Sequence, residues 1–240
     1  MVKTLYLEET DSTNDFLRYY TPEEGEEMTV VWTDFQRKGR GQGANHWESE
    51  AGKNLTFSVL IHPDEVRAQD QYIISMAVAE TMHRYLSGML DAAVHIKWPN
   101  DIYVGDSKIG GILIENHLSG EHIKDCIIGI GLNVNQTVFV SDAPNPISLR
   151  MIDDREWNRE EVLQGLIAEL VWQFKHFRID VIRKKYRRHL YRREGIYPYR
   201  DVDGEFEAEL LEVENDGHLV LLDTQGRQRR YAFKEVAYLV

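Results

Sequence analysis

Two segments of this chain carry charged side chains of the kind that act on phosphate or carboxylate groups. The first is the glycine-rich loop Gly39-Arg40-Gly41-Gln42-Gly43, which follows an apolar segment. Glycines let a backbone approach a ligand closely and expose N–H groups to an anion, and Arg40 adds a bidentate cation. The glycine spacing fits neither a dinucleotide fingerprint nor a P-loop. The loop therefore predicts either an anion site of another kind or a flexible surface hairpin.

The second segment places a lysine, a carboxamide and a carboxylate at the end of one strand. Its residues are Lys97-Trp98-Pro99-Asn100-Asp101, and Lys108-Ile109-Gly110-Gly111 follows after a short turn. Gly105-Asp106-Ser107 is typical of a hairpin, which returns Lys108 toward the strand that Asp101 begins. We expect these groups to converge near one end of a sheet. The alternative is a solvated hairpin with ordinary surface charges.

Other features carry a weaker signal. Ser12-Thr13-Asn14 is first of all a helix N-cap, and Gly129-Ile130-Gly131-Leu132-Asn133 is a strand that either admits a ligand or contains a bulge. No histidine shows HExxH spacing, and His117 and His122 have no third partner, so we predict no metal site. Arg183–Arg193 holds seven Lys or Arg residues, which either meet nucleic acid or an acidic protein or form the outer face of a helix.

The apolar pattern predicts the elements that position these groups. Strands are expected over residues 3–8, 29–32, 55–61, 94–98, 102–104, 109–115 and 126–134. Helices are expected after Ser12, over 70–90, and from a capping box of Asn158 and Glu161 to about Tyr191. Strands this closely spaced favour a mainly antiparallel sheet, and so an α+β fold rather than a doubly wound one.

The C-terminal part of the chain has a different character. Glycine-containing turns separate short strands over 205–213, 218–222 and 228–233. This pattern predicts a small β-barrel appended to the main domain. We place the boundary near Arg193–Gly195, which gives domains of residues 1–193 and 194–240.

Composition limits the class of protein. The chain has 240 residues, of which 42% are apolar, and its 28 basic against 40 acidic residues give a formal net charge of −12. This charge disfavours general binding to nucleic acid. No segment is apolar over the length of a membrane span, the first residues lack the apolar core of a signal peptide, and the single cysteine, Cys126, excludes an intrachain disulfide. We expect a cytoplasmic protein.

The order of the motifs resembles that of biotin protein ligases, the enzymes that biotinylate acetyl-CoA carboxylase. The motifs are Ser12-Thr13-Asn14, Gln36 with Gly39-Arg40-Gly41 and Trp47, Lys97-Trp98-Pro99-Asn100-Asp101, Lys108-Ile109-Gly110-Gly111-Ile112-Leu113-Ile114-Glu115, and Gly129-Ile130-Gly131-Leu132-Asn133-Val134. The resemblance covers about residues 4–190, and the C-terminal strands are similar in kind to the family's SH3-like domain. It implies a catalytic domain related to class II aminoacyl-tRNA synthetases.

The resemblance implies two half-reactions. Biotin and MgATP form biotinyl-5′-AMP and pyrophosphate, and a lysine of a biotin carboxyl carrier domain then attacks this mixed anhydride to form an amide. In the first step one anion attacks another, so cations must offset the developing charge. The resemblance assigns this role to Arg40 and Lys108, with Lys97 as a third cation nearby. In the second step Asp101 orients or deprotonates the carrier lysine, with Asn100 as a supporting neighbour.

The same resemblance implies the binding residues. Those for biotin are Ser12, Thr13, Asn14, Gln36, Gly39, Arg40, Gly41, Gln42, Lys108, Gly111, Gly129 and Gly131. Those for ATP are Arg40, Trp47, Asn100, Lys108 and Asn133, and Mg²⁺ is expected only together with ATP. The glycine-rich loop and the polar stretch 135–145 are candidate lids that become ordered when ligand binds, because the adenylate is labile in water.

Other interpretations stay open. A lipoate–protein ligase shares the fold and the adenylate chemistry, although the motif from Lys97 to Asp101 and the glycine-rich loop favour biotin. A second alternative is a non-catalytic protein that only senses biotinyl-AMP. The presence of Arg40, Asp101 and Lys108 together argues against it.

The chain also departs from some relatives. Its first motif begins at Ser12, which leaves no room for the N-terminal DNA-binding domain that makes some of them repressors, so we expect no such role. Gln42 stands where some relatives have arginine. We expect a monomer or a homodimer, with neither DNA nor a membrane as partner.

Overall fold

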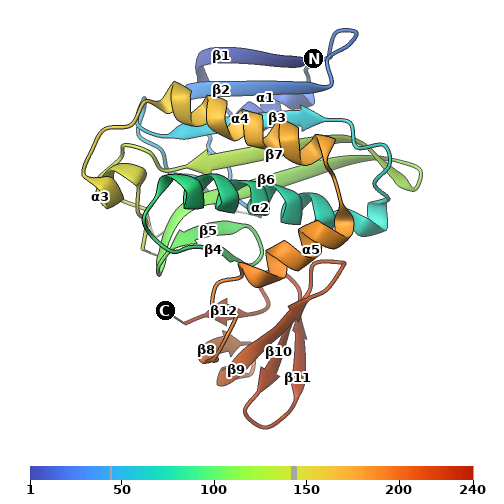
Figure 1. Cartoon of the computed structure of the whole chain (residues 1–240), viewed down its shortest axis with the longest axis vertical. Helices are drawn as coiled ribbons and strands as arrows, with labels where there is room; N and C mark the ends of the chain where they lie inside the picture. The colour runs from blue at the N-terminus through green and yellow to red at the C-terminus, as the bar shows by residue number, and fades with distance from the viewer. Residues whose placement is uncertain (44, 142–144, 240) are drawn as a thin grey trace.

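A single large sheet forms the centre of the computed structural model, which describes residues 1–43, 45–141 and 145–239. The seven strands follow the order β1-β2-β3-β7-β6-β5-β4 (Figure 1). They are β1 (Val2–Thr10), β2 (Met28–Gln36), β3 (Leu55–Ile61), β4 (Val94–Lys97), β5 (Asp101–Val104), β6 (Ser107–Ser119) and β7 (His122–Leu132). β1 and β2 run parallel and the other neighbouring pairs are antiparallel. The predicted α+β fold with a mainly antiparallel sheet is confirmed.

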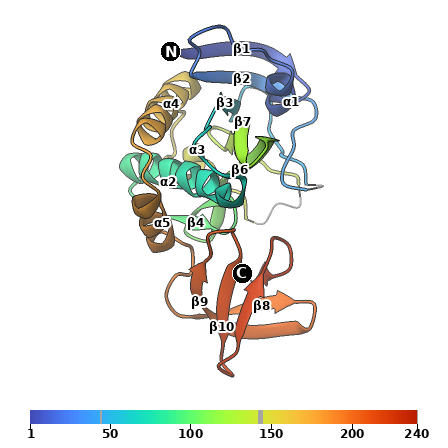
Figure 2. The same cartoon turned by 90° about the vertical axis from the view of Figure 1, so that its right-hand side faces the viewer.

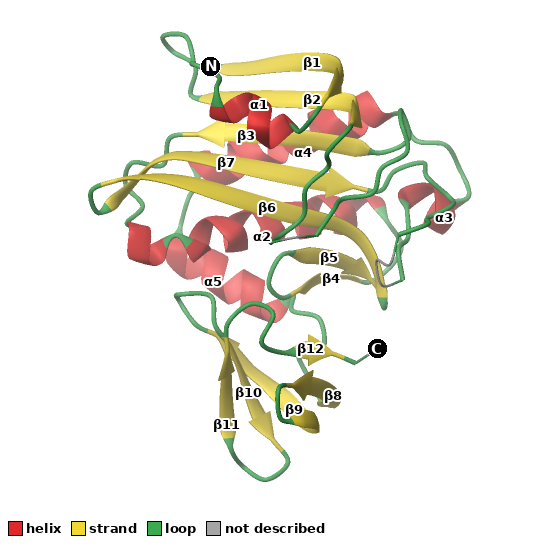
Figure 3. Ribbon diagram, turned by 180° about the vertical axis from the view of Figure 1, so that it is seen from behind, coloured by secondary structure: helices red, strands yellow, loops and turns green. Residues whose placement is uncertain are grey.

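Helices cover the two faces of this sheet unequally. One face carries α2 (Tyr72–Met89), α4 (Arg159–Lys175) and α5 (Ile179–Arg188), whereas the short helix α1 (Thr13–Arg18) lies on the other (Figure 2). A further short helix, α3 (Leu149–Asp153), follows β7. Seen from behind, α1 and several loops lie in front of the strands and the long helices lie beyond them (Figure 3).

Hydrophobic packing explains which helix covers which face. Ile74, Val78 and Met82 of α2 are fully buried against the sheet, as their helical spacing predicts. On the other face Leu17 of α1 packs with Leu60 and other residues of the strands in a smaller cluster. Because this second cluster is small, α1 covers only part of its face.

The helical segment that begins at Asn158 is divided into two helices, which corrects the expectation of one helix to about Tyr191. Asn158 caps α4 as predicted, because its side chain accepts from the amides of Glu160 and Glu161. The helix ends at His176, whose φ of −115° and ψ of 40° lie outside the helical region. The chain then turns so that α5 packs on α2, where the ring of Tyr186 meets the ring of Tyr72 edge-on. Tertiary packing of α5, which periodicity does not show, produces the break.

The basic segment of residues 183–193 pairs largely within the chain. Arg183 lies 3.6 Å from the carboxylate of Asp70, and Arg187 lies 2.9 Å from that of Glu212. Both arginines lie on α5, and Arg187 reaches β9 (Gly204–Val213) of the C-terminal part, in line with the simpler of the two interpretations.

A second, five-stranded antiparallel sheet contains the C-terminal residues, with the order β11-β10-β9-β8-β12. Its strands are β8 (Ile196–Asp201), β9 (Gly204–Val213), β10 (Leu219–Asp223), β11 (Gln228–Tyr231) and β12 (Ala237–Tyr238). The sheet fits the SH3-like domain that the resemblance implies. β8 and β12 were not expected as strands, because β8 contains a proline and β12 has two residues.

The small sheet contacts the large one near the predicted site. The indole Nε1 of Trp98 donates a 2.8 Å hydrogen bond to the carbonyl of Gly217, in the turn between β9 and β10. The backbone of Leu190 forms a bridge with Ile96 of β4, just before the C-terminal strands begin. In the part of the chain that the structure describes, no helix is long and apolar enough to cross a membrane.

Candidate active site

A cleft of about 900 Å³ lies on the α1 face of the large sheet and extends to the C-terminal strands. Most residues predicted for the site line this cleft: Ser12, Thr13, Asn14, Gln36, Arg40, Gly41, Gln42, Trp47, Lys97, Asn100, Asp101, Lys108, Gly111, Gly129 and Gly131. They come from α1, the glycine-rich loop, β6, β7 and the β4–β5 turn. The predicted convergence of separate motifs is thus present, and the role of each residue stays a prediction.

Glycines form the floor of the cleft. Gly111 of β6 pairs directly with Gly131 of β7, so both project toward the same face. A Cβ atom at Gly131 would overlap the indole ring of Trp47, and one at Gly129 would overlap the amide of Asn14. The glycines therefore let Trp47 and Asn14 lie directly on the sheet. Trp47 Nε1 is buried and has no hydrogen-bond partner among the described residues, so it remains available as a donor.

Neutral polar groups occupy one end of the cleft. The side-chain oxygen of Gln36 accepts from the backbone amide of Thr13 at 2.7 Å and from its hydroxyl at 3.0 Å. Ser58 Oγ lies 2.6 Å from Thr13 Oγ1 and 2.5 Å from Asn14 Oδ1. Ser12 caps α1 through the amide of Asp15, as its position predicts. This end is suited to a small uncharged group with both donors and acceptors.

Sequence reasoning did not identify Ser58 as a site residue. It is a fully buried hydroxyl within the apolar strand β3, opposite Gly129 of β7. A lone serine in such a strand is a signal, because a buried hydroxyl needs a partner.

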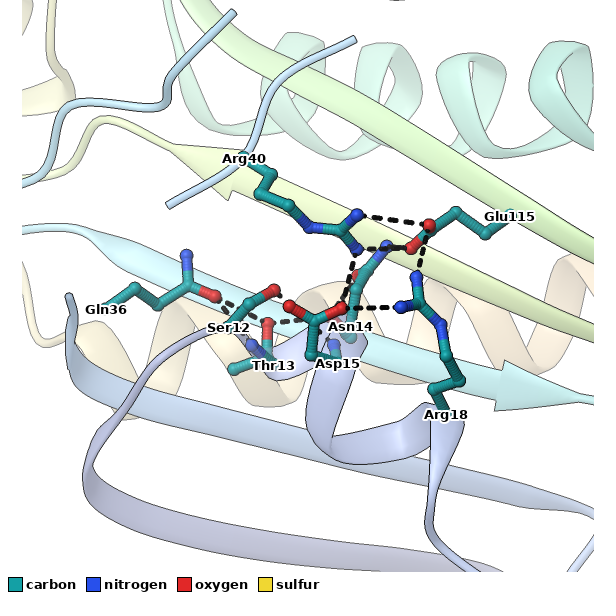
Figure 4. Close-up of polar contacts among 9 residues, drawn as sticks. Ser12, Thr13, Asn14, Asp15, Arg18, Gln36, Arg40 and Glu115 are labelled. Carbon is teal, nitrogen blue, oxygen red and sulfur yellow. Dashed lines mark hydrogen bonds and ion pairs between the residues drawn. The ribbon is translucent and has the colours of Figure 1, made fainter. Parts of the chain in front are cut away.

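Four charged residues form a neutral cluster beside this end of the cleft (Figure 4). Arg40 lies 2.7 Å from Glu115 Oε2 and 3.1 Å from Asp15 Oδ1. Arg18 lies 2.7 Å from Glu115 Oε1 and 3.0 Å from Asp15 Oδ1. Two guanidinium groups and two carboxylates thus share their charges, and Asn14 adds a 2.7 Å hydrogen bond to Glu115.

The cluster fixes the charge state of Glu115. Burial disfavours its charged form, but hydrogen bonds from Asn14 and Arg40 outweigh this effect and hold the pKa of Glu115 below its usual value. The Nε of Arg40 is buried without a partner among the described residues. No role was assigned to Glu115, Asp15 or Arg18 from the sequence. Glu115 could have been detected, because it lies four residues after Gly111 in a strand and so faces the same side of β6.

Beside Gly111 on the floor of the cleft, Lys108 and Asp101 form an ion pair. Their Nζ and Oδ1 atoms are 2.6 Å apart. The register of β5 and β6 shifts between Ile102 and Tyr103, and this bulge brings the Lys108 side chain back to Asp101. Asn100 donates from Nδ2 to the carbonyl of Ile112 at 2.6 Å and so holds the β4–β5 turn against β6.

Two predicted residues, Asn133 and Gly39, do not line the cleft. Asn133 is buried, and its Nδ2 donates to the carbonyl of Ile147 at 3.0 Å. The carbonyl of Gly39 accepts from the amide of Trp47 at 3.0 Å, and a Cβ at Gly39 would collide with the Trp47 backbone. In this structure both residues support the walls of the cleft. Their contacts with a ligand stay predictions.

Glu48, which follows the glycine-rich loop, connects this part of the chain to the stretch 135–145. Its carboxylate accepts from the amides of Val140 and Ser141 at 2.9 and 2.8 Å. Burial disfavours the charged form, but hydrogen bonds from Ser141 and Val140 lower the pKa of Glu48. Residue 44, directly after the glycine-rich loop, and residues 142–144 of the stretch 135–145 lie outside the described residues, so the lid prediction is untested there.

Two of the histidines form a cluster with a glutamate, which the sequence did not indicate. Ligand atoms of Glu80, His83 and His189 lie within 4.8 Å of one another, away from the cleft. The two imidazoles, however, stack with centroids 3.9 Å apart and an interplanar angle of 8°. Their in-plane lone pairs therefore do not converge on one ion.

Comparisons with known proteins agree with the fold. The model described as the biotin/lipoate A/B protein ligase family matches residues 6–133. The chain is 28% identical over 232 residues to the bifunctional ligase/repressor BirA of Bacillus subtilis, covering 86% of this chain and 65% of that protein. It is 35% identical over 152 residues to the biotin–protein ligase of Homo sapiens, covering 58% of this chain and 20% of that protein.

Similarity to solved structures extends over nearly the whole chain. The biotin protein ligase from Aquifex aeolicus in complex with biotin and ATP is 25% identical, with a TM-score of 0.79, and the match covers 98% of this chain and 97% of that one. The chain spans 65% of the length of the Bacillus relatives it matches. These matches confirm the resemblance seen in the motifs. The chain belongs to the biotin/lipoate A/B protein ligase family.

Proposed function

We propose that this chain is an ATP-dependent biotin–protein ligase. The observation that carries the proposal is the arrangement of one cleft, in which a neutral polar end, a glycine floor under Trp47 and the cations Arg40 and Lys108 occur together. A ureido ring offers one carbonyl acceptor and two N–H donors, which suit the hydroxyls and amides around Thr13 and Gln36. The aliphatic chain of biotin suits the space between Trp47 and the glycine strands. Mg²⁺ enters with ATP.

The cations serve the first half-reaction. The biotin carboxylate attacks the α-phosphorus of ATP, the bond to pyrophosphate breaks, and biotinyl-5′-AMP forms. Arg40 and Lys108 stabilise the negative charge that develops on the phosphate. Loss of one such contact costs roughly 2.7–4 kcal/mol of transition-state stabilisation, by analogy with a lost oxyanion donor. Trp47, Asn100 and Asn133 are the further residues we assign to the nucleotide.

The second half-reaction transfers biotin to protein. The acceptor is the lysine of a biotin carboxyl carrier domain, and Asp101 orients this lysine at the cleft. Asp101 is suited to this task because it lines the cleft while Lys108 holds its carboxylate in place.

The test is ATP–pyrophosphate exchange with biotin, lipoate and octanoate offered separately to the full chain. Exchange with biotin alone is expected. Exchange with lipoate or octanoate instead would show the related lipoate chemistry, and biotin binding without exchange would show a sensor. Lys108→Met should lower exchange about 10²–10³-fold, whereas Lys124→Met, on the exposed part of β7, serves as the matched control.

Further properties belong to the same proposal. Residues 1–193 and 194–240 act as catalytic and SH3-like domains of a monomer or homodimer. The net charge of −12 disfavours DNA as a partner, and a gel shift with biotin-operator DNA would contradict this. The buried thiol of Cys126 is compatible with a reducing, cytoplasmic compartment.

A further inference from the structure

Two of the lysines that line the cleft, Lys97 and Lys108, have different surroundings. Lys108 has a carboxylate partner, Asp101, at 2.6 Å. Lys97 has none, because no carboxylate oxygen of the described residues lies within 4.0 Å of its Nζ. Its Nζ instead contacts the hydroxyl of Tyr103 at 2.8 Å. The two side chains therefore differ in what stabilises their charge.

The carboxylate nearest to Lys97 in the hairpin already has Lys108 as its partner. Lys97 of β4 and Asp101 of β5 are direct partners in the hairpin register, so their side chains project from the same face. The Asp101 carboxylate is bound to Lys108, which reaches it from β6. Asp101 is thus paired with Lys108 and not with Lys97, although it lies beside Lys97 in the hairpin.

Aromatic rings enclose the amine of Lys97. Its Nζ lies 4.6 Å from the ring centre of Tyr103 and 5.3 Å from that of Tyr238. Tyr238 belongs to β12, so the C-terminal sheet supplies one wall, and both Lys97 and Tyr238 line the cleft. Burial is the largest effect on this amine and lowers the pKa of Lys97. Asp101 opposes the shift, whereas Lys108 and Arg192 add to it.

The hydroxyl of Tyr103 can serve either form of the amine. Burial raises the pKa of Tyr103 well above its usual value, so the phenol keeps its proton. It accepts a hydrogen bond from a charged Lys97 and donates one to an uncharged Lys97. The contact thus persists when Lys97 changes its protonation state, and the amine stays in place.

We propose that Lys97 is the proton acceptor of the transfer half-reaction, an inference that rests on the proposed ligase function. The carrier lysine enters the cleft as an ammonium ion and gives one proton to the uncharged Nζ of Lys97. Its nitrogen then bonds to the biotinyl carbonyl carbon. The bond from that carbon to the phosphate oxygen breaks, with the electron pair leaving on AMP. The second proton of the nitrogen and the proton on Lys97 pass to water.

This assignment divides the work among the charged groups of the cleft. Lys108 stays a cation for the phosphate, Asp101 orients the incoming lysine, and Lys97 takes its proton. It replaces the role of third cation that the sequence suggested for Lys97.

The first test measures the titration of Lys97 directly. The full chain is labelled with ¹³C-lysine, and the Lys97 signal is assigned by its loss in Lys97→Arg. We expect this side chain to titrate below the other lysines, and we expect Tyr238→Leu, which admits water, to raise its pKa. Titration of Lys97 together with the surface lysines would overturn the proposal.

The second test measures transfer from preformed biotinyl-AMP to a purified carrier domain in a single turnover, per adenylate bound. We expect the rate to rise with pH to a plateau at the pKa found for Lys97. Lys97→Arg, whose side chain is always protonated and cannot accept a proton, should slow transfer about 10²–10⁴-fold. Tyr238→Leu should move the profile to higher pH and regain the rate there, which a merely structural role would not produce.

The outcomes separate this inference from the function on which it rests. If biotin supports no pyrophosphate exchange, the ligase proposal fails. If exchange occurs but Lys97→Arg transfers biotin at the rate of the parent protein, only the role of Lys97 is wrong.

Discussion

The indole of Trp47 lies where a side chain at residue 131 would begin, so that Gly131 is the place on which Trp47 rests. This contact joins the glycine-rich loop to the floor of the cleft. A Cβ atom at residue 131 would therefore force Trp47, and with it the loop, to move.

Gly131→Ala should therefore displace Trp47. We expect a loss of unfolding free energy of about 1–3 kcal/mol, as for other overpacked sites, together with weaker biotin binding. Chemical denaturation and isothermal calorimetry measure the two effects. Gly88→Ala is the matched control, because nothing lies within 4 Å of a Cβ there; helix propensity predicts a gain of roughly 0.5–1 kcal/mol. Equal biotin affinity in parent and Gly131→Ala would contradict the role of this contact.

Ser58→Ala should weaken the neutral end of the cleft. The change leaves the buried oxygens of Thr13 and Asn14 without one contact, at a cost of about 1–3 kcal/mol in stability. We expect the biotin dissociation constant to rise as well, since both neighbours line the cleft. Thr81→Ala removes a buried hydroxyl from α2 and should cost stability while leaving biotin affinity unchanged. Identical behaviour of the two variants would show that Ser58 acts on folding alone.

Glu48→Gln tests the connection between the segment after the glycine-rich loop and the stretch 135–145. The amide oxygen accepts more weakly than the carboxylate from the backbone of Val140 and Ser141. Limited proteolysis without ligand should therefore cut the stretch 135–145 faster in the variant. Addition of biotin and ATP should protect both proteins. Ligands that leave the cleavage rate unchanged would refute the lid prediction.

Asp223 should make the small sheet sensitive to acid. Burial disfavours its charged form, but the Arg227 amide and the Arg229 and Arg227 guanidinium groups outweigh this and lower the pKa of Asp223 from 3.8 to about 2. Because the folded pKa lies below the unfolded one, the stabilisation is complete above about pH 4 and is lost as pH falls through about 2.

Melting temperatures of the parent and of Asp223→Asn measure this effect. The variant should melt lower at neutral pH, and the difference should shrink between about pH 4 and 2. A difference that stays constant over this range would assign the effect to packing and not to charge.

Short-range patterns predicted much of the fold. β3 has the predicted bounds because every residue of Leu55–Ile61 is buried and the run is unbroken. The turn after Val104 was predicted from Gly105, and in the structure Gly105 takes a positive φ of 57°, a conformation that favours glycine. The break before α5 was not visible, since apolar spacing continues through Phe174 and Phe177. Packing against α2, and not local propensity, decides it.

The candidate site divides in the same way. Lys108 and Asp101 are a few residues apart on one hairpin, so their convergence followed from the turn. Glu115 and Asn14 are 101 residues apart in sequence, and only the sheet order brings them together. Tyr238 is a stronger case, because it lies in a two-residue strand of another sheet. Such residues become visible only when the tertiary structure is known.

The cluster of Arg18, Arg40, Asp15 and Glu115 has an electrostatic consequence for the cleft. With two positive and two negative groups, it has no net charge, so it attracts polyanions only weakly. Arg40 can bind a phosphate without leaving Glu115 unpaired, because Arg18 and Asn14 still donate hydrogen bonds to Glu115. Arg40 can therefore turn toward a phosphate while Asp15 and Glu115 both keep Arg18 as a partner.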